Sequence, residues 1–377
     1  MRKTKGTLDS STLLANLRKS TGSITLNESE FSKPKEFYST GCYALNRIIS
    51  GSFFGGIPEG RLTILYGESA SAKSYIAAST AAQAIKDNKI NVCFLLDSEG
   101  GVSKDMFDMF EDNVSSNIEH ILVESVEDCS GKISNILTTI KKIQENDPEF
   151  KAMIILDSIG ALISSSMLQK IDDNNQVSDM GTKAKLINTM IKSINIPALK
   201  TGTSVIINNH IYDDPNARFP SKIKTQSGGR GLIYMSRMMI QCQRSLNNNT
   251  DKQSAEICLG TTIKFICTKN MLIQPFHSCQ VEIDFSKGFV SPYTGLLDLA
   301  LKYGFVKEHS TQSFVVPSWN DKPFKKALLF NGPDSDKIWN SFINVLDEVQ
   351  NNDIKYGALL SENENLEAVD LDEDSSN

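Results

Sequence analysis

The chain has 377 residues, 40% of them hydrophobic and 22% charged, and a formal net charge of −6 at pH 7, which fits a soluble globular protein with one large domain and smaller additions. It has no apolar run of roughly 20 residues and no apolar stretch after its basic start, which excludes a membrane span and a secretory signal. Its seven cysteines lack C-x-x-C spacing and its four histidines are dispersed, so we expect reduced, buried thiols and no zinc site.

Residues 1–37 are polar, and a helix is predicted at residues 10–19 before a linker. From Tyr38 onward, short apolar strands alternate with helical patterns at residues 73–86, 127–144 and 180–199. This alternation predicts βαβ units and an α/β fold with a mostly parallel central sheet. The later strands follow one another closely, which predicts a hairpin extension at one edge of the sheet. The predicted strands span residues 61–66, 91–96, 120–125, 152–157, 203–209, 235–243, 261–268 and 280–285.

The stretch GESASAKS follows an apolar strand and opens a helix, which is typical of a phosphate-binding loop. Its small residues let backbone N–H groups surround a phosphate, Lys73 would reach the β- and γ-phosphates, and the Ser74 hydroxyl would bind Mg²⁺. The common pattern has glycine before the lysine, and here that residue is Ala72. A serine-rich turn without a ligand is the alternative. The predicted nucleotide contacts are Gly67, Glu68, Ser69, Ala70, Ser71, Ala72, Lys73, Ser74 and Tyr75.

Three other strands end in polar residues that would face the same crevice. The run AMIILD ends in Asp157, whose carboxylate would hold Mg²⁺ through water. The run VCFLLDSEGG ends in a carboxylate cluster at residues 97–99 that would polarise the attacking water, although a cluster of helix N-caps is the alternative. The run SVIINNH ends in His210, which would sense the γ-phosphate by a hydrogen bond or be a structural histidine.

The ordered set of segments resembles the RecA-type recombinases, most closely the UvsX-type recombinases of tailed bacteriophages. The resemblance covers residues 36–307, and it implies a RecA-like P-loop ATPase core over residues 38–305. It also implies that the chain binds ATP and Mg²⁺, forms a helical filament on single-stranded DNA and exchanges strands with a homologous duplex. The segments are STGCYALNRIISGSFFGGIPEGRLTILYGESASAKS, LLDSEGG, IILDSIGAL, SDMGTKAKLINTMIKSI, VIINNHIY, SGGRGLIYMS and SPYTGLLDLALKYGFV.

The resemblance implies catalytic roles for Lys73, Glu99, His210 and Lys269. Glu99 matches the catalytic glutamate, and Lys73 and Ser74 match the phosphate and Mg²⁺ residues. His210 stands where cellular members carry a glutamine that couples ATP to a DNA loop. Lys269 matches the first of two lysines that reach the γ-phosphate of a neighbouring subunit.

Two positions depart from the family pattern around the nucleotide. Met271 stands where the second of those lysines would be, which leaves one cation across the subunit interface. Met106 stands where a tyrosine usually stacks on adenine, so contact with the base would be weaker or come from Phe285. The phage branch also relaxes the glycine before the loop lysine, which makes Ala72 compatible with nucleotide binding.

Two long polar loops, at residues 168–178 and 211–227, match the DNA-binding loops of the family. The helix after the first loop carries a polar stripe at i, i+3 and i+7, and a glycine-rich turn after the second would present N–H groups to phosphate. Plain solvated loops and a solvated helix face are the alternatives. The predicted DNA contacts are Lys185, Asn188, Lys192, Arg218, Lys222, Lys224, Gly228, Gly229 and Arg230.

The two ends of the chain have separate expected roles. The resemblance implies that the N-terminal segment, residues 1–37, docks on a neighbouring subunit through Phe31, with Phe37 as the second candidate. The alternative is that Phe31 packs on its own subunit. Residues 306–359 form a small C-terminal region. Residues 360–377 are a disordered tail with seven carboxylates, which would either increase solubility or compete with DNA for basic surface.

The expected partners are single-stranded DNA, a homologous duplex and further copies of the chain, together with a loading mediator and a single-strand-binding protein. We expect no membrane partner and a cytoplasmic location, which is the host cytoplasm if a phage encodes the chain. Two other functions share the same core. One is a ring-forming helicase or motor of RecA fold. The other is a non-catalytic recombination mediator, an alternative that is supported by the departures from the family pattern at Ala72 and Met271.

Overall fold

The computed structural model describes residues 10–110, 113–173, 181–213, 224–226, 228–245, 260–284, 288–317 and 320–350. The chain divides into two compact units, Met1–Lys35 and Glu36–Asn377. In the first unit, α1 (Ser10–Thr21) buries none of its residues, and three leucines on one side of it, Leu13, Leu14 and Leu17, are exposed. Arg18 and Lys19 lie in its last turn, where the helix dipole favours cations.

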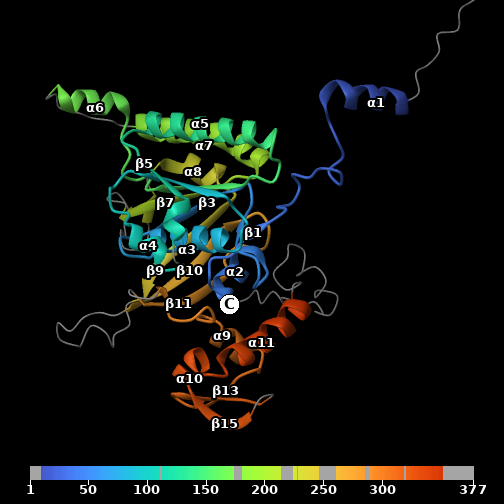
Figure 1. Cartoon of the computed structure of the whole chain (residues 1–377), viewed down its shortest axis with the longest axis vertical. Helices are drawn as coiled ribbons and strands as arrows, with labels where there is room; N and C mark the ends of the chain where they lie inside the picture. The colour runs from blue at the N-terminus through green and yellow to red at the C-terminus, as the bar shows by residue number, and fades with distance from the viewer. Residues whose placement is uncertain are drawn as a thin grey trace, which may run out of the picture. The chain divides into compact units, whose positions relative to one another are not determined.

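A ten-stranded sheet forms the centre of the second unit (Figure 1). Its order is β12-β11-β10-β9-β3-β7-β6-β4-β5, and β8 pairs with the end of β7. The six strands from β9 to β5 run parallel, whereas β10, β11 and β12 add antiparallel strands at one edge. The predictions of an α/β fold, a mostly parallel sheet and an antiparallel extension are therefore confirmed. The strands are β3 (Leu62–Gly67), β4 (Val92–Asp97), β5 (Ile118–Leu122), β6 (Ala152–Asp157), β7 (Ser204–Asp213), β8 (Lys224–Gln226), β9 (Met238–Ser245), β10 (Gly260–Asn270), β11 (Ser278–Asp284) and β12 (Gly288–Phe289).

Both faces of the sheet are covered, which is why its central strands read as continuous apolar runs. Side chains alternate between the faces, so Ile64 and Leu65 of β3 belong to different apolar clusters. The Ile64 cluster includes α5 (Val126–Gln144), α7 (Thr182–Thr201) and α8 (Gly229–Met235), and Figure 1 shows α5 and α7 side by side over the sheet. The Leu65 cluster includes α2 (Tyr43–Ser50) and α3 (Lys73–Lys86).

The C-terminal region packs on this second cluster through aromatic rings. Trp339 is fully buried, and its ring stacks on Tyr293, which stacks in turn on Tyr43 of α2. The region adds a three-stranded antiparallel sheet, which the sequence pattern did not predict. Its elements are α9 (Leu297–Lys302), β13 (Lys307–Ser310), β14 (Ser313–Val316), β15 (Asn320–Lys325), α10 (Lys326–Asn331) and α11 (Ser335–Gln350).

Short elements complete the second unit. β1 (Phe37–Tyr38) pairs with β2 (Ile57–Pro58), so Phe37, the second docking candidate, lies in a strand of this unit. Between β4 and β5 lie α4 (Lys104–Asp108) and the 3-10 helix η1 (Val114–Asn117), and α6 (Ser165–Asp172) follows β6. The predicted acidic tail lies outside the described residues. No helix in the described part of the chain is long and apolar enough to cross a membrane.

Candidate functional site

The carboxyl ends of four neighbouring strands bring the predicted site residues to one edge of the sheet. In the parallel register, Gly67 of β3 lies opposite His210 of β7, and Asp97 of β4 lies opposite Asp157 of β6. Ligands in open α/β sheets bind outside this edge. The sheet order therefore brings polar residues together from segments that are far apart in the sequence.

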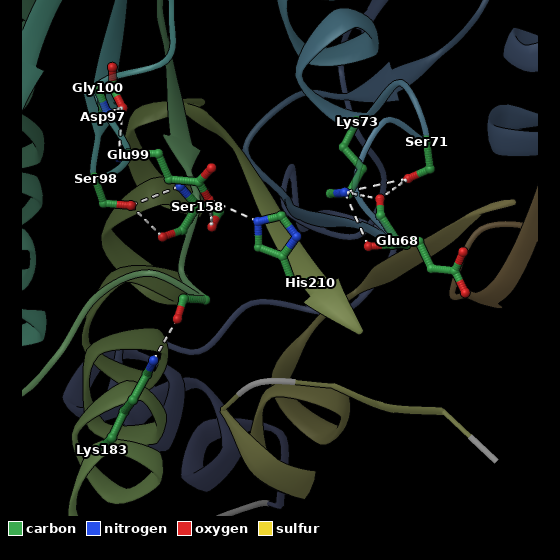
Figure 2. A network of polar contacts seen from close by, with 12 residues as sticks. Glu68, Ser71, Lys73, Asp97, Ser98, Glu99, Gly100, Ser158, Lys183 and His210 are labelled. Carbon is green, nitrogen blue, oxygen red and sulfur yellow. Dashed lines mark hydrogen bonds and ion pairs between the residues drawn. The ribbon is translucent and has the colours of Figure 1, made fainter. Parts of the chain in front are cut away.

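The phosphate loop is closed on itself by Lys73, the first residue of α3. Its ammonium donates to the carbonyl oxygens of Gly67 at 3.1 Å and Glu68 at 2.7 Å, and it lies 3.4 Å from the Ser71 hydroxyl (Figure 2). Ser71 donates to the Glu68 carbonyl at 2.7 Å. A side chain at Gly67 would meet the Cys242 carbonyl oxygen at 2.2 Å, so only glycine fits this strand exit.

The first amides of α3 are directed into this loop. The first backbone bond of the helix runs from the Ile76 amide to the Ala72 carbonyl, so the preceding amides have no partner inside the helix. Such amides and the positive end of the helix favour an anion. Burial lowers the pKa of Lys73, while nearby acidic groups that include Asp157 and Glu99 oppose the shift. A phosphate group would supply the counter-charge that the buried ammonium lacks.

Ala72 has the backbone conformation that the usual glycine would have. Its φ is 64° and its ψ is 19°, which is left-handed, and Ala70 has a φ of 57°. For residues other than glycine this region costs about 1–2 kcal/mol because Cβ approaches the following carbonyl oxygen. The chain therefore forms the loop with two strained alanines.

We expect Ala72→Gly to stabilise the protein by about 1 kcal/mol, because glycine has the left-handed conformation without steric cost. In a domain of this size the gain corresponds to a Tm increase of about 1–2 °C. Nucleotide affinity should change by less than about threefold, because the strain is the same in the free and bound loop. The matched control is Ala77→Gly in the interior of α3, which should be destabilising. Equal destabilisation by both changes would contradict the strain at Ala72.

Glu99 accepts two hydrogen bonds that orient its carboxylate. The donors are the Ser158 hydroxyl, just after β6, and His210 Nε2 at 2.8 Å (Figure 2). Burial raises the pKa of Glu99 most, but these two bonds and the charges of His210 and Lys73 outweigh it and leave the pKa below its ordinary value. Glu99 is therefore ionised at neutral pH and can accept a proton from water.

The turn that carries Glu99 is held from both sides. Asp97 is buried, and its Oδ1 accepts from the amides of Glu99 at 2.9 Å and Gly100 at 2.8 Å. The Ser98 hydroxyl donates to the Ser158 carbonyl at 2.7 Å and accepts from the Ser158 amide at 2.9 Å. The helix that follows begins after Ser103, whose side chain makes no capping hydrogen bond. Residues 97–99 therefore form the turn after β4 and bind the segment after β6, and they do not cap a helix.

Asp157 and Ser74 place hard oxygen atoms beside the phosphate loop. Asp157 is 8% exposed, and its burial together with the Glu99 and Asp97 carboxylates raises its pKa. The neighbouring polar side chains of Ser74 and Asn208 act in the opposite direction and lower its pKa. In the described residues no three His, Cys, Asp or Glu side chains gather as a metal cage. A hydroxyl and a carboxylate next to a phosphate loop fit Mg²⁺, which takes few protein oxygens and completes its shell with waters and substrate phosphates.

We expect Asp157→Asn to raise the Tm at pH 7 without Mg²⁺ and to weaken Mg²⁺-dependent ATP binding by about 10- to 100-fold. The folded-state pKa of Asp157 is raised, so its ionised form costs stability at pH values above that pKa, and the amide removes this cost. Thermal unfolding and a Mg²⁺ titration of ATP binding measure the two effects. Asp147→Asn, an exposed aspartate before the same strand, is the control and should change neither. A lower Tm with unchanged Mg²⁺ dependence would contradict the assignment.

Two of the other three predicted nucleotide contacts, Tyr75 and Met106, lie in described parts of the chain. The ring of Tyr75 packs edge-on against Phe110 and Phe289, and burial raises the pKa of its hydroxyl. Met106 lies on α4 and is half-buried against the apolar cluster of α2 and α3. Phe285 lies outside the described residues. Contact of these side chains with a nucleotide base stays a prediction.

Lys269 has partners inside its own chain. Its ammonium donates to the carbonyls of Ile233 at 2.7 Å and Tyr234 at 3.0 Å, at the C-terminal end of α8, where a cation is favoured. Burial lowers its pKa, and the nearby Arg237 guanidinium adds to the shift. Arg237 also donates to the Met271 sulfur at 3.2 Å. A second cation therefore lies beside Lys269, although position 271 is methionine.

The predicted polar stripe on α7 is exposed at two of its three positions. Lys185 and Lys192 are exposed, whereas Asn188 is half-buried against α8, where a side chain at Gly231 would overlap its amide. Gly228 and Gly229 have φ values of 90° and 70° and pack close to Ile187 and Ala184 of α7. The glycines thus allow α8 to approach α7.

The predicted DNA loops are shorter than the sequence suggested. Residues 168–172 belong to α6, because Ser164 caps this helix by accepting the Met167 amide. At the second loop, β7 continues to Asp213 and β8 pairs with it, so both ends are strands. Lys224 lies in β8 and Arg230 in α8, whereas Arg218 and Lys222 lie outside the described residues. DNA binding by all of these residues stays a prediction.

Several residues of the network were not singled out from the sequence. Ser158 directly follows the apolar strand that ends in Asp157, and this position at the end of a buried strand is the sequence signal that could have indicated it. Ser98 lies in the cluster at residues 97–99, for which helix capping was the alternative interpretation. Lys183 donates to the Gly160 carbonyl at 2.6 Å. The sequence signal for this residue is its position in the first turn of a helix, where a cation is disfavoured. Phe31 of the first unit is 39% exposed, and its docking on another subunit stays a prediction.

Known proteins resemble the chain over most of its length. A family model described as RecA N-terminal domain matches residues 11–290. Protein RecA of Mycoplasmopsis pulmonis is 26% identical over 275 residues, which are 72% of this chain and 74% of that protein. Protein RecA of Malacoplasma penetrans is 26% identical over 294 residues, or 78% and 81% of the two chains. Protein RecA of Sulfurovum sp. is 27% identical over 283 residues, or 75% of each.

Proposed function

The chain belongs to the RecA N-terminal domain family, and from this membership we propose that it is a DNA-dependent ATPase that acts as a recombinase. In this proposal it forms a helical filament on single-stranded DNA and pairs that strand with a homologous duplex. Strand exchange would serve recombination, repair and recombination-dependent replication. Within the family we propose kinship with the UvsX-type recombinases of tailed bacteriophages, and a cytoplasmic site of action, in the host if a phage encodes the chain.

The observation that carries the proposal is the convergence of Lys73, Glu99, Asp157 and His210 at one edge of the sheet. A phosphate loop alone would support nucleotide binding without hydrolysis. Here an ionised carboxylate, held by Ser158 and His210, lies beside a loop whose lysine is already directed inward. This arrangement supports hydrolysis of a nucleoside triphosphate.

In the proposed reaction, Glu99 orients a water molecule and accepts a proton from it as the water oxygen attacks the γ-phosphorus. The bond to the β-phosphate oxygen breaks, and ADP and phosphate are the products. Lys73 and the amides of the loop stabilise the charge on the phosphate oxygens. When bound by Ser74 and, through water, by Asp157, Mg²⁺ would neutralise further charge there.

His210 links hydrolysis to DNA in this proposal. It lies in β7, whose end at Asp213 leads into the predicted second DNA loop, and it contacts Glu99 directly. A γ-phosphate that competes for the Glu99–His210 hydrogen bond would change the end of β7 and so the loop. ATP at the interface between subunits would favour the form that binds DNA tightly, and hydrolysis would weaken it.

Three measurements test the proposal together. ATP hydrolysis is measured with and without single-stranded DNA, strand exchange is measured between homologous and heterologous DNAs, and negative-stain images are taken with ATP and single strands. We expect stimulated hydrolysis, exchange only between homologous DNAs, and helical filaments. Stimulated hydrolysis with closed rings and no exchange would favour a helicase-type motor. DNA binding without hydrolysis would favour a non-catalytic mediator that loads or caps filaments of another recombinase.

The proposed partners follow from the same reaction. Single-stranded DNA, a homologous duplex and further copies of the chain take part directly. A loading mediator and a single-strand-binding protein would act before them, because a recombinase must gain access to strands that other proteins cover. Co-sedimentation with single strands that are first coated by a single-strand-binding protein tests whether the chain alone displaces it.

A further inference from the structure

Lys183 is a cation in an unfavourable place on its own helix. It lies in the first turn of α7, where the helix dipole disfavours positive charge, and this turn contains no acidic residue. Its side chain is half-buried, and the ammonium donates to the Gly160 carbonyl at 2.6 Å (Figure 2). A charge-assisted bond of this length to another segment compensates for the poor local placement.

Gly160 connects this contact to the nucleotide site. It lies three residues after Asp157, and a side chain there would come within 3.1 Å of the His210 ring carbon Cδ2. The segment at residues 158–160 is therefore contacted on one side by Glu99 and His210 and bound on the other by Lys183. Because the imidazole lies directly against Gly160, a shift of this backbone changes the distance between His210 and Glu99.

We propose that Lys183 is a positioning residue that couples α7 to ATP hydrolysis by holding the Gly160 carbonyl, and with it the Glu99–His210 pair. The inference rests on the proposed function, in which Lys185 and Lys192 of the same helix contact DNA. When DNA displaces the start of α7, Lys183 carries the displacement to residues 158–160. Both the Lys183 and the His210 bonds are short, so a movement of about 1 Å is enough to weaken them.

The rival role for Lys183 is a direct contact with a DNA phosphate. That role predicts weaker DNA binding and a smaller salt dependence when the charge is removed. The coupling role predicts unchanged DNA affinity and a lower rate when DNA is saturating. Steady-state kinetics and equilibrium DNA binding therefore separate the two.

The kinetic experiment compares Lys183→Ala, Lys183→Arg and the wild-type chain. We expect Lys183→Ala to lower kcat at saturating single-stranded DNA by about tenfold, since misplaced catalytic groups cost up to about 10²-fold. The KM for ATP and the Kd for DNA, measured by fluorescence anisotropy at two salt concentrations, should change by less than about twofold. Lys183→Arg keeps a donor and should restore most of the stimulation. The control is Lys200→Ala, which removes an exposed cation from the last turn of the same helix.

A second experiment needs neither DNA nor hydrolysis. Amide hydrogen exchange at residues 181–189 is measured with and without a non-hydrolysable ATP analogue. The analogue should change exchange there in the wild-type chain but not in Lys183→Ala. Gly160→Ala keeps the lysine but presses a methyl group on His210, and it should show the same low stimulated rate as Lys183→Ala.

The outcomes are distinguishable. Stimulation of Lys183→Ala equal to that of the wild-type chain overturns the coupling and leaves the ATPase intact. Weaker DNA binding with an unchanged rate at saturation assigns Lys183 to a phosphate contact and also overturns it. If the wild-type chain hydrolyses no ATP, the proposed function fails, and the exchange experiment alone decides whether Lys183 links the two segments.

Discussion

Glu99→Gln is expected to lower kcat for ATP hydrolysis by about 10²- to 10⁴-fold, with and without DNA, because the amide cannot accept a proton from water. The glutamine oxygen can still accept from Ser158 and His210, so the local structure and the fold should persist. Nucleotide affinity should stay within about threefold of the wild-type value, because Glu99 acts on the water and not on the ground-state phosphate. The measurements are phosphate release and binding of a fluorescent ATP analogue.

The control for this experiment is Glu149→Gln, which changes an exposed carboxylate before β6, outside the predicted site. It should hydrolyse ATP at nearly the wild-type rate. A Glu99→Gln variant within tenfold of wild type would contradict the role of Glu99 as the base. The variant also has a practical use, since a filament that binds ATP without hydrolysing it should remain on DNA.

The positions of the strands in the chain and their polar ends were predictable from the sequence because buried parallel strands have a strong pattern. Each is a short continuous apolar run, and three of the four site strands end in a polar residue directly after that run. The α3 helix was predicted at residues 73–86, which are its observed bounds, because its lysine and serine mark the turn from strand to helix. Local pattern therefore singled out Lys73, Asp157 and the carboxylates at residues 97–99, and the family resemblance selected Glu99 among them.

The contacts between these residues were not predictable, because they depend on which strands are neighbours. Ser158 reaches Glu99 because β6 lies beside β4, and Gly160 touches His210 because β7 lies on the other side of β6. No local signal encodes that order. Lys269 shows the same limit, since its bonds to α8 follow from the antiparallel pairing of β9 and β10.

The three-stranded sheet of the C-terminal region was not predicted, because its strands are short and one of them is fully exposed. All four residues of β13, KEHS, are exposed, so this strand has none of the alternation that marks a half-buried strand. The core of the region instead comes from Trp339 and Phe342 of α11. Phe314 and Val316 of the small sheet belong to the same apolar cluster.

Lys73→Ala is expected to abolish measurable ATP hydrolysis, with kcat/KM lower by at least about 10²- to 10³-fold, because the loss removes a charge aimed at the transferred phosphate. ATP should also no longer raise the Tm, because ligand stabilisation depends on binding to the folded state. Lys73→Arg should fail as well, since a planar guanidinium cannot replace a compact ammonium between the Gly67 and Glu68 carbonyls. Lys86→Ala, at the other end of the same helix, is the control and should keep both properties.

The geometry explains why so much depends on one side chain. The Lys73 ammonium lies among the Gly67 and Glu68 carbonyl oxygens and the Ser71 hydroxyl, so it is the cation that the loop itself holds in place. In Lys73→Ala, the phosphate would lose this cation, and the helix dipole of α3 alone contributes only about 0.3–1 kcal/mol at an exposed site. Retained binding with full turnover would show that another cation serves the phosphates, and Lys269, which the family resemblance directs to the nucleotide of a neighbouring subunit, would be the next residue to replace.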